Sequence, residues 1–214
     1  MIKAIFVTGT DTGVGKTIVC SLLNRYFLEK GYRVITQKWI ETGVAKNSGK
    51  NNSGPVFPYR FKLAASAHLA AAMENKKIKA ARIIKAFKAL SAKYDFVIVE
   101  GIGGALVPFD KKHLVIDIAK QLKLPVLVVS RNRLGAINHT LLTIEALQKR
   151  RMNILGLVFN NLNKDNKAVI KDNPRIIKAL TGEKIFGILP KMGKKEELYK
   201  KFMPIGKRIY EQLA

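Results

Sequence analysis

Short apolar runs alternate along the chain with longer segments in which apolar residues recur at helical spacing. The apolar runs predict strands at residues 4–8, 34–38, 96–100, 126–130, 154–160 and 185–189. The periodic segments predict helices at residues 16–30, 65–74, 78–92, 114–122, 135–150, 173–180 and 194–213. Runs such as Val97-Ile98-Val99 are apolar throughout, which is typical of strands covered on both faces. The pattern therefore predicts one α/β domain over residues 1–214, with a doubly wound, mostly parallel sheet and helices on both faces.

A glycine-rich turn follows the first predicted strand and leads into the first predicted helix. From Gly9 to Thr17 the chain reads Gly-Thr-Asp-Thr-Gly-Val-Gly-Lys-Thr. Such a turn directs backbone N–H groups at an anion, Lys16 adds a positive charge for phosphate, and the Thr17 hydroxyl is placed to hold Mg²⁺. Five residues separate Gly9 from Gly15, whereas the strict pattern has four. The turn still predicts a nucleoside triphosphate site of the P-loop NTPase type.

The ends of the next two strands carry charged candidates, because ligands of open parallel sheets bind beyond the carboxyl ends of the strands. Lys38 ends the second predicted strand, where it either holds phosphate or an anionic substrate or is an ordinary surface lysine. Glu100 ends the third predicted strand and is either a metal contact or a partner of a helix cap. Its expected place beside the phosphate loop favours the metal contact.

Three later segments also lie where strands end or helices begin. The fourth predicted strand leads to a helix entrance at Gly135 and Asn138, whose free N–H groups are placed to receive a substrate carboxylate. Asn160 ends the fifth strand, where its amide can present a donor and an acceptor to a purine edge. The sixth strand ends at a candidate wall for the nucleotide base, formed by Pro190, Lys191 and Met192.

The chain is strongly basic, with 39 Lys and Arg residues against 15 Asp and Glu residues and a formal net charge of +24. A basic excess of this size suggests nucleic acid or an anionic surface as a partner. The cations are scattered, however, and between residues 78 and 90 they lie opposite an apolar stripe, as on a solvated amphipathic helix. The sequence contains no recognised nucleic-acid module and no aromatic–basic platform for stacking bases. We therefore expect a basic surface that attracts phosphate ligands, and no specific nucleic-acid partner.

The sequence predicts a cytoplasmic protein without a membrane partner. Its first residues run directly into a strand without the layout of a signal peptide, and no apolar stretch approaches the roughly 20 residues of a membrane span. The lone cysteine, Cys20, cannot form an internal disulfide, and helix packing is its expected role. The polar stretch 45–57, which contains glycine and proline, is either a lid or a passive connector.

Four motifs, taken in chain order, make the sequence resemble the dethiobiotin synthetases. They are the phosphate loop, then Lys38 with Thr42-Gly43, then Glu100-Gly101-Ile102-Gly103-Gly104, then Leu134-Gly135-Ala136-Ile137-Asn138-His139-Thr140. Residues 59–62 and 65–70 are similar to that family's chain between the second and third strands. The resemblance runs to about residue 161 and is weaker afterwards. The five-residue spacing of the phosphate loop is the family's own spacing.

This resemblance implies an ATP- and Mg²⁺-dependent ring closure in biotin synthesis, carried out by a homodimer. The implied small-molecule substrates are ATP, CO₂ and the diamine 7,8-diaminononanoate. The implied catalytic residues are Lys16 and Lys38. The implied ATP contacts are Gly13, Val14, Gly15, Lys16, Thr17, Ile18, Glu100, Gly101, Ile102, Gly103, Asn160, Pro190, Lys191 and Met192. The implied substrate contacts are Thr12, Lys38, Thr42, Gly135 and Asn138, and the implied metal contacts are Thr17 and Glu100.

The chain departs from the family's pattern near the metal site. The family commonly has an aspartate as a further metal contact in the loop after the second strand, but residues 45–59 contain no acidic residue. Either Asp11 or water takes that place, or the metal is held more weakly. Trp39 stands where the family usually has proline after the lysine, and Ala67 replaces a proline before His68.

Two other functions remain open from the sequence. A partitioning or positioning ATPase would share the doubly wound phosphate-loop architecture and would bind DNA or membrane through its basic surface. Such proteins typically carry an additional lysine near the start of the loop, where this chain has Thr10 and Asp11. The other alternative is a relative that activates a carboxylate or transfers phosphate to a different metabolite.

Overall fold

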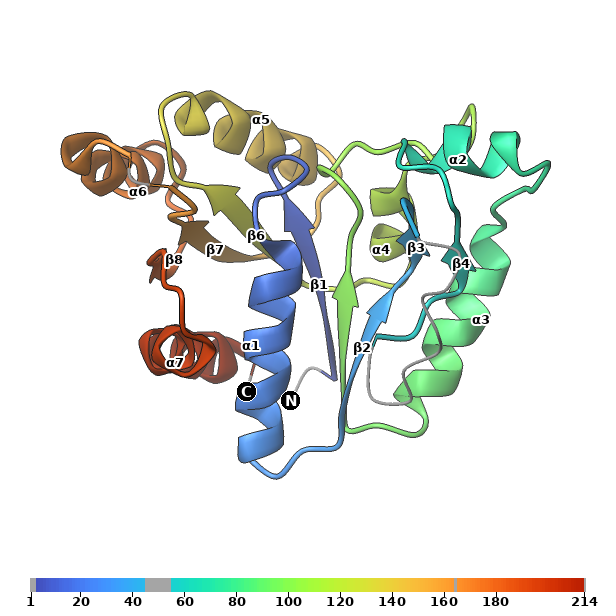
Figure 1. Ribbon diagram of the computed structural model, residues 1–214, viewed down its shortest axis with the longest axis horizontal. Helices are drawn as coiled ribbons and strands as arrows, with labels where there is room; N and C mark the ends of the chain where they lie inside the picture. Colours follow the sequence, from blue (N-terminus) through green and yellow to red (C-terminus); the bar gives the residue numbers. More distant parts are fainter. Residues whose placement is uncertain (1–2, 45–54, 164, 214) are drawn as a thin grey trace.

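A six-stranded parallel sheet forms the middle layer of this computed structural model, which describes residues 3–44, 55–163 and 165–213 (Figure 1). The spatial order of the strands is β2-β5-β1-β6-β7-β8. Their bounds are β1 Ala4–Gly9, β2 Val34–Lys38, β5 Phe96–Glu100, β6 Val126–Arg131, β7 Ile154–Asn160 and β8 Ile185–Leu189. All six strands predicted from the apolar runs are confirmed. A small parallel pair, β3 (Ile40–Glu41) and β4 (Tyr59–Arg60), was not predicted, because two-residue strands have no periodic pattern.

Helices cover both faces of the sheet, as the apolar strands predict (Figure 1). One face packs against α1 (Lys16–Glu29) and α7 (Lys195–Leu213). The other face is covered by α2 (Ala67–Met73), α3 (Ala80–Ser91), α4 (Val115–Gln121), α5 (Ala136–Gln148) and α6 (Lys167–Thr181). Successive residues of β1 alternate between the two layers, because Ile5 and Val7 join the α1–α7 core while Ala4 and Phe6 join the other.

The strand order reverses at β1, which lies between β5 and β6 and is followed by the phosphate loop. The register of the parallel pairs brings the predicted charged residues together at this point. Glu100 pairs with Val7 of β1 on one side and with Lys38 of β2 on the other. A crevice at such a reversal is the usual ligand site of an open α/β sheet.

The prediction for the sixth helix was wrong at its start. It was expected to begin near Asn173, ahead of Pro174, but α6 begins at Lys167 and carries Pro174 in its interior. A proline there leaves the carbonyl of Ile170, four residues earlier, without its helical donor. The Asn132 side-chain amide donates to that carbonyl at 2.8 Å, while the Asn173 amide donates to Asn132 Oδ1 at 2.9 Å. This buried contact with the loop after β6 compensates for the proline.

The polar stretch expected at residues 45–57 is described only from residue 55, so its lid or connector role lies outside the described residues. The end of this stretch is bonded to β2, because the Val56 N–H donates to Thr36 O and the Val56 carbonyl accepts from the Lys38 N–H.

Cys20 is 1% exposed within the α1–α7 core, which agrees with a packing role. No helix in the described part of the chain is both long and apolar enough to cross a membrane.

The Asn132 contact yields a stability prediction. Asn132→Ala is expected to lower the free energy of unfolding by about 2 kcal/mol, because the Ile170 carbonyl and the Asn173 amide lose a partner away from water. Pro174→Ala restores an N–H for the Ile170 carbonyl, so Asn132→Ala should cost less in that background. Urea unfolding of the four proteins of this cycle measures the difference, and an equal cost in both backgrounds would contradict the explanation.

Candidate active site

The phosphate loop adopts a conformation that requires its glycines. Gly13 and Gly15 have positive φ angles of 70° and 98°, and a Cβ on Gly15 would lie 2.0 Å from Asn160 Nδ2. Gly15 is also the N-cap of α1, and its carbonyl accepts from the Val19 N–H. The N–H groups of the first helical turn have no carbonyl partner within the helix, so they are available to an anion.

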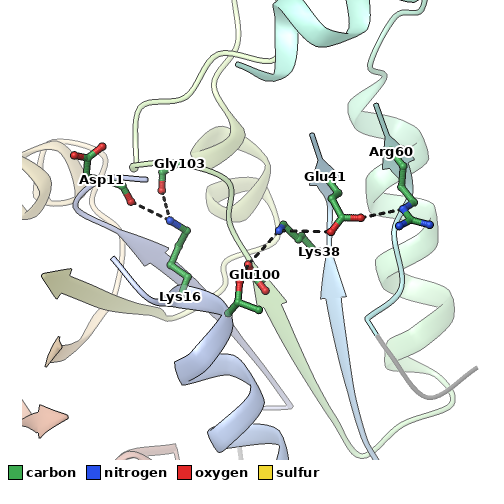
Figure 2. Close-up of polar contacts among 8 residues, drawn as sticks. Asp11, Lys16, Lys38, Glu41, Arg60, Glu100 and Gly103 are labelled. Carbon is green, nitrogen blue, oxygen red and sulfur yellow. Dashed lines mark hydrogen bonds and ion pairs between the residues drawn. The ribbon is translucent and has the colours of Figure 1, made fainter. Parts of the chain in front are cut away.

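Lys16 crosses the loop and is held at both sides of it. Its Nζ donates to the backbone carbonyls of Asp11 at 3.0 Å and Gly103 at 2.6 Å (Figure 2). The residue is only 7% exposed, and loss of water on burial lowers the pKa of its ammonium group, although Glu100 acts in the opposite direction. The site therefore keeps a poorly hydrated cation ready for a negatively charged ligand.

Glu100 is the centre of a second group of contacts beside the loop. The Thr17 hydroxyl donates to Glu100 Oε1 at 2.6 Å, and Lys38 Nζ lies 3.5 Å from the same oxygen. Glu100 is 2% exposed, and its Oε2 has no hydrogen-bond partner among the described residues. A hydroxyl beside a buried carboxylate with an unused oxygen offers the hard oxygen donors that Mg²⁺ prefers. The residues present thus fit a magnesium site.

A single cleft of about 380 Å³ gathers most of the predicted site residues. It is lined by Thr12, Gly13, Gly15, Lys16, Thr17, Ile18, Lys38, Thr42, Glu100, Gly101, Ile102 and Gly103. Leu162, from the loop after β7, also lines this cleft and was not predicted, because no motif marks it. Loops that follow β1, β2, β5 and β7 therefore meet in one place, as expected for the carboxyl edge of the sheet.

The remaining predicted residues lie outside this cleft. Val14 is buried, and its carbonyl accepts from the Asn160 amide at 2.9 Å, so Asn160 braces the phosphate loop. The Asp11 carboxylate accepts from the Thr12 N–H and points away from Lys16 and Glu100 (Figure 2). Residues 190–192 follow Leu189, whose carbonyl accepts from the Asn161 N–H, next to the end of β7. Gly135 and Asn138 are exposed at the start of α5.

An ion pair next to Lys38 was missed by the sequence reasoning. Glu41 Oε1 lies 3.8 Å from Lys38 Nζ, and Glu41 Oε2 lies 2.9 Å from Arg60 Nε. The signal that could have found it is an acidic residue three positions after a candidate catalytic lysine in a chain with few acidic residues. Its partner Arg60 could not be found in this way, because it lies 19 residues further along.

The parallel sheet with its strand reversal, the glycine loop and the Lys–Thr–Glu cleft define a P-loop nucleotide-binding protein. A family model described as AAA domain matches residues 3–197. An ATP-dependent dethiobiotin synthetase of Thermodesulfovibrio yellowstonii is 37% identical, over 86% of this chain and 87% of its own length. One of Methanococcus vannielii is 43% identical, over 73% of this chain and 78% of its own. The chain belongs to the family of ATP-dependent dethiobiotin synthetases.

Solved structures with much lower identity share the fold. A cobyrinic acid a,c-diamide synthase of Mycobacterium smegmatis, with an ATP analogue and magnesium bound, has a TM-score of 0.65 and 16% identity, over 99% of this chain and 96% of its own. The pNOB8 ParA protein bound to nonspecific DNA has a TM-score of 0.66 and 13% identity, over 99% of this chain and 98% of its own. At these identities the likeness shows the doubly wound P-loop fold alone.

The buried ammonium of Lys16 yields a prediction about stability. Lys16→Met is expected to abolish nucleotide binding yet raise the melting temperature of the ligand-free protein by about 3 °C, because a desolvated cation is replaced by an apolar chain.

The pH dependence gives an independent check on this explanation. The pKa of Lys16 is lowered on folding, so between this lowered pKa and the usual value of 10.5 the unfolded protein binds more protons than the folded one. The loss of stability caused by Lys16 therefore decreases as the pH rises toward 10.5. The difference in melting temperature between Lys16→Met and the unaltered protein should become smaller over the same pH range. A calorimetric series that shows a constant difference, or a less stable variant, would refute the account.

Proposed function

We propose that the protein is a cytoplasmic ATP-dependent dethiobiotin synthetase, which carboxylates 7,8-diaminononanoate with CO₂ and closes a cyclic urea. The products are dethiobiotin, ADP and phosphate. The observation that supports this most directly is the cluster of Lys16, Thr17, Lys38 and Glu100 in one cleft of a chain that belongs to this family. A second lysine beyond the phosphate-loop lysine is what a reaction between two anionic groups requires.

The proposed chemistry has three steps. A neutral amine of the substrate attacks CO₂ and loses a proton, which gives a carbamate anion. A carbamate oxygen then attacks the γ-phosphorus of ATP, and ADP leaves. Finally the second amine attacks the carbonyl carbon of the carbamic–phosphoric anhydride, phosphate leaves, and a proton is released as the ring closes. The second step brings a negatively charged nucleophile against a negatively charged phosphoryl group, so electrostatic stabilisation is the main demand on the protein.

The cleft supplies one cation for the phosphoryl group and one for the carbamate in that step. Lys16 enters it from the phosphate loop, and Lys38 enters it from the end of β2. In the proposed complex Lys16 contacts the transferred phosphoryl group and the carbamate, while Lys38 stabilises the carbamate. Thr12 and Thr42, which line the same cleft, would contact the diamine. Backbone N–H groups of the glycine loop would hold the other phosphates.

We also propose that Thr17 and Glu100 hold Mg²⁺ in this cleft. Support comes from the Thr17 hydroxyl at 2.6 Å from Glu100 Oε1 and from the buried Glu100 Oε2 that lacks a hydrogen bond among the described residues. When bound, the metal would neutralise charge on the phosphate oxygens. Asp11 is the weaker candidate for the family's missing loop aspartate, because its carboxylate is bonded to the Thr12 N–H and points away from Glu100 (Figure 2).

The nucleotide base is proposed to lie at the ends of β7 and β8. Asn160, Pro190, Lys191 and Met192 are the candidates on this side of the phosphate loop. Asn160 would act chiefly through the loop, because its amide is already engaged by Val14 O and its side chain is buried. Residues 190–192 are better placed for direct contact, since they follow β8 and are at least partly exposed.

We further propose that the protein is a homodimer whose partner subunit meets the substrate near Gly135 and Asn138. The exposed apolar side chains in this region support the idea. Leu134, Leu106 and Leu142 are 83%, 51% and 56% exposed, and the last two line a groove of about 430 Å³ together with residues of the phosphate loop. Exposed apolar groups gathered in one region are typical of surfaces that a partner covers.

The partitioning ATPase remains the second candidate, because the net charge of +24 and the fold shared with a DNA-bound ParA protein both favour it. The two functions differ in what ATP turnover depends on. A synthetase needs the diamine and bicarbonate, whereas a partitioning ATPase hydrolyses ATP without either and shifts duplex DNA in a salt-sensitive manner. A relative that acts on a different metabolite would leave the diamine unchanged.

Lys38→Ala is expected to lower turnover by about a hundredfold or more without unfolding the protein, because it removes a cation from the side of the carbamate. Phosphate release and dethiobiotin formation are measured with and without the diamine and bicarbonate. Lys88→Ala, on the exposed face of α3, is the matched control and should keep full activity. Near-normal dethiobiotin formation by Lys38→Ala would exclude the role of Lys38, and ATP hydrolysis that needs DNA but no diamine would exclude the synthetase.

Replacing both Leu134 and Leu142 with aspartate is expected to convert the proposed dimer into monomers, because charged groups cannot be buried there without partners. Light scattering during size-exclusion chromatography measures the mass at several protein concentrations. Leu180→Asp is the control, since Leu180 on α6 is also exposed, at 61%. A monomeric mass for the unaltered protein, or a dimer that survives both substitutions, would reject this interface.

A further inference from the structure

Lys38 lies between two carboxylates that come from different strands. Its Nζ is 3.5 Å from Glu100 Oε1 and 3.8 Å from Glu41 Oε1 (Figure 2). The two acids differ in their surroundings, because the Glu100 side chain is 3% exposed and also bonded to Thr17, whereas that of Glu41 is 23% exposed. One carboxylate thus belongs to the candidate metal site, and the other does not.

The backbone around Lys38 is fixed by neighbours on both sides. The Lys38 N–H donates to Val56 O at 3.0 Å, and the Trp39 carbonyl accepts from the Tyr59 N–H at 3.2 Å. Trp39 is fully buried and stacks on Phe6 with 5.3 Å between ring centroids. What remains free in Lys38 is the rotation of its long side chain, so the position of its ammonium group depends on the groups that pair with it.

Glu41 is itself held from its far side. The register of the small β3–β4 sheet places Arg60 directly opposite Glu41, and Arg60 Nε lies 2.9 Å from Glu41 Oε2. The Arg60 guanidinium also lies over the Phe57 ring, 4.8 Å from its centroid. Lys38 and Thr42 line the cleft on either side of Glu41 in the sequence, but among the described lining residues Glu41 does not appear. Glu41 therefore pairs with Lys38 but is not among the described residues that line the cleft.

We infer that Glu41, held by Arg60, is the positioning residue that keeps the Lys38 ammonium directed at the reacting groups. The inference rests on the proposed role of Lys38. If Glu100 is engaged by a metal ion, Glu41 would be the carboxylate that still pairs with the Lys38 ammonium. Arg60 completes the arrangement, because a carboxylate paired with a guanidinium on its other oxygen keeps its own orientation.

The test compares Glu41→Gln, Arg60→Gln and the double variant with the unaltered enzyme. Glu41→Gln is expected to lower kcat about tenfold, whereas KM for ATP stays within about twofold, because Lys38 is less well oriented while the phosphate loop is unchanged. Arg60→Gln should lower kcat about threefold, and the double variant should match Glu41→Gln because Arg60 acts through Glu41. Glu41→Asp should recover part of the lost kcat.

A second measurement does not depend on turnover. Lys38 released from one of its two ion pairs should react several times faster with a lysine-acylating reagent in Glu41→Gln, as quantified by peptide mass spectrometry. Lys16 in the same digest serves as an internal control with unchanged reactivity. Arg150→Gln is the matched variant. Arg150 forms a similarly half-buried ion pair, in which its Nε lies 3.6 Å from Asp117 Oδ1, and neither residue lines the cleft. This variant should leave both readouts unchanged.

The outcomes separate this inference from the proposed function. If Lys38→Ala loses diamine-dependent turnover while Glu41→Gln keeps the kcat of the unaltered enzyme, the positioning role is wrong and the synthetase stands. An equal loss in Arg150→Gln, or additive losses in the double variant, would also overturn it by showing a general effect on stability. If the unaltered protein has no diamine-dependent turnover, the proposed synthetase function is wrong. If, in addition, Lys38 is acylated at the same rate in Glu41→Gln and in the unaltered protein, the Glu41–Lys38 contact is refuted as well.

Discussion

The parallel register of β2, β5 and β1 is the constraint on which the site depends. It sets Lys38 beside Glu100 and Glu100 beside Val7, two residues before the phosphate loop begins. Three segments that are far apart in the sequence therefore deliver a lysine, a carboxylate and an anion-binding turn to one edge of the sheet. A slip of one residue in either pair would turn Glu100 or Lys38 to the opposite face of the sheet, which packs against the other of the two apolar cores. Tight burial of these strands on both faces prevents such a slip.

The same burial makes the charged groups of the site electrostatically costly. Lys16 and Glu100 are almost fully removed from water, and their mutual attraction offsets only part of the loss of hydration, since the pKa of Lys16 is still lowered. The Lys16 ammonium donates to the backbone carbonyls of Asp11 and Gly103. A bound nucleotide would replace these weak neutral acceptors by charged oxygens. Hydrogen bonds between an ammonium group and charged oxygens are stronger than those to neutral carbonyls, which favours an anionic ligand at this place.

The sequence permits prediction of the strands and the phosphate loop because both are local features. An apolar run of five residues is sufficient to mark a strand such as β5, and the glycine loop is contiguous. The elements that were missed depend on distant partners. The Glu41–Arg60 pair needs the β3–β4 register, and the proline inside α6 needs Asn132, 38 residues before the carbonyl that it bonds. The start of α6 does have a local cap, because the Asn166 side chain accepts from the Ala168 N–H. An interior proline usually ends or kinks a helix, however, so the sequence favours a start beside Pro174.

The basic excess of the chain and the charge of the cleft are separate matters. At the site Lys38 is paired with Glu100 and Glu41, and Lys16 lies in the field of Glu100, so the positive charges there are nearly balanced by carboxylates. Exposed cations elsewhere contribute a long-range potential that raises the encounter rate with any phosphate compound and is screened by salt. They cannot select one phosphate compound over another. Selection among phosphate compounds must therefore come from the residues that line the cleft.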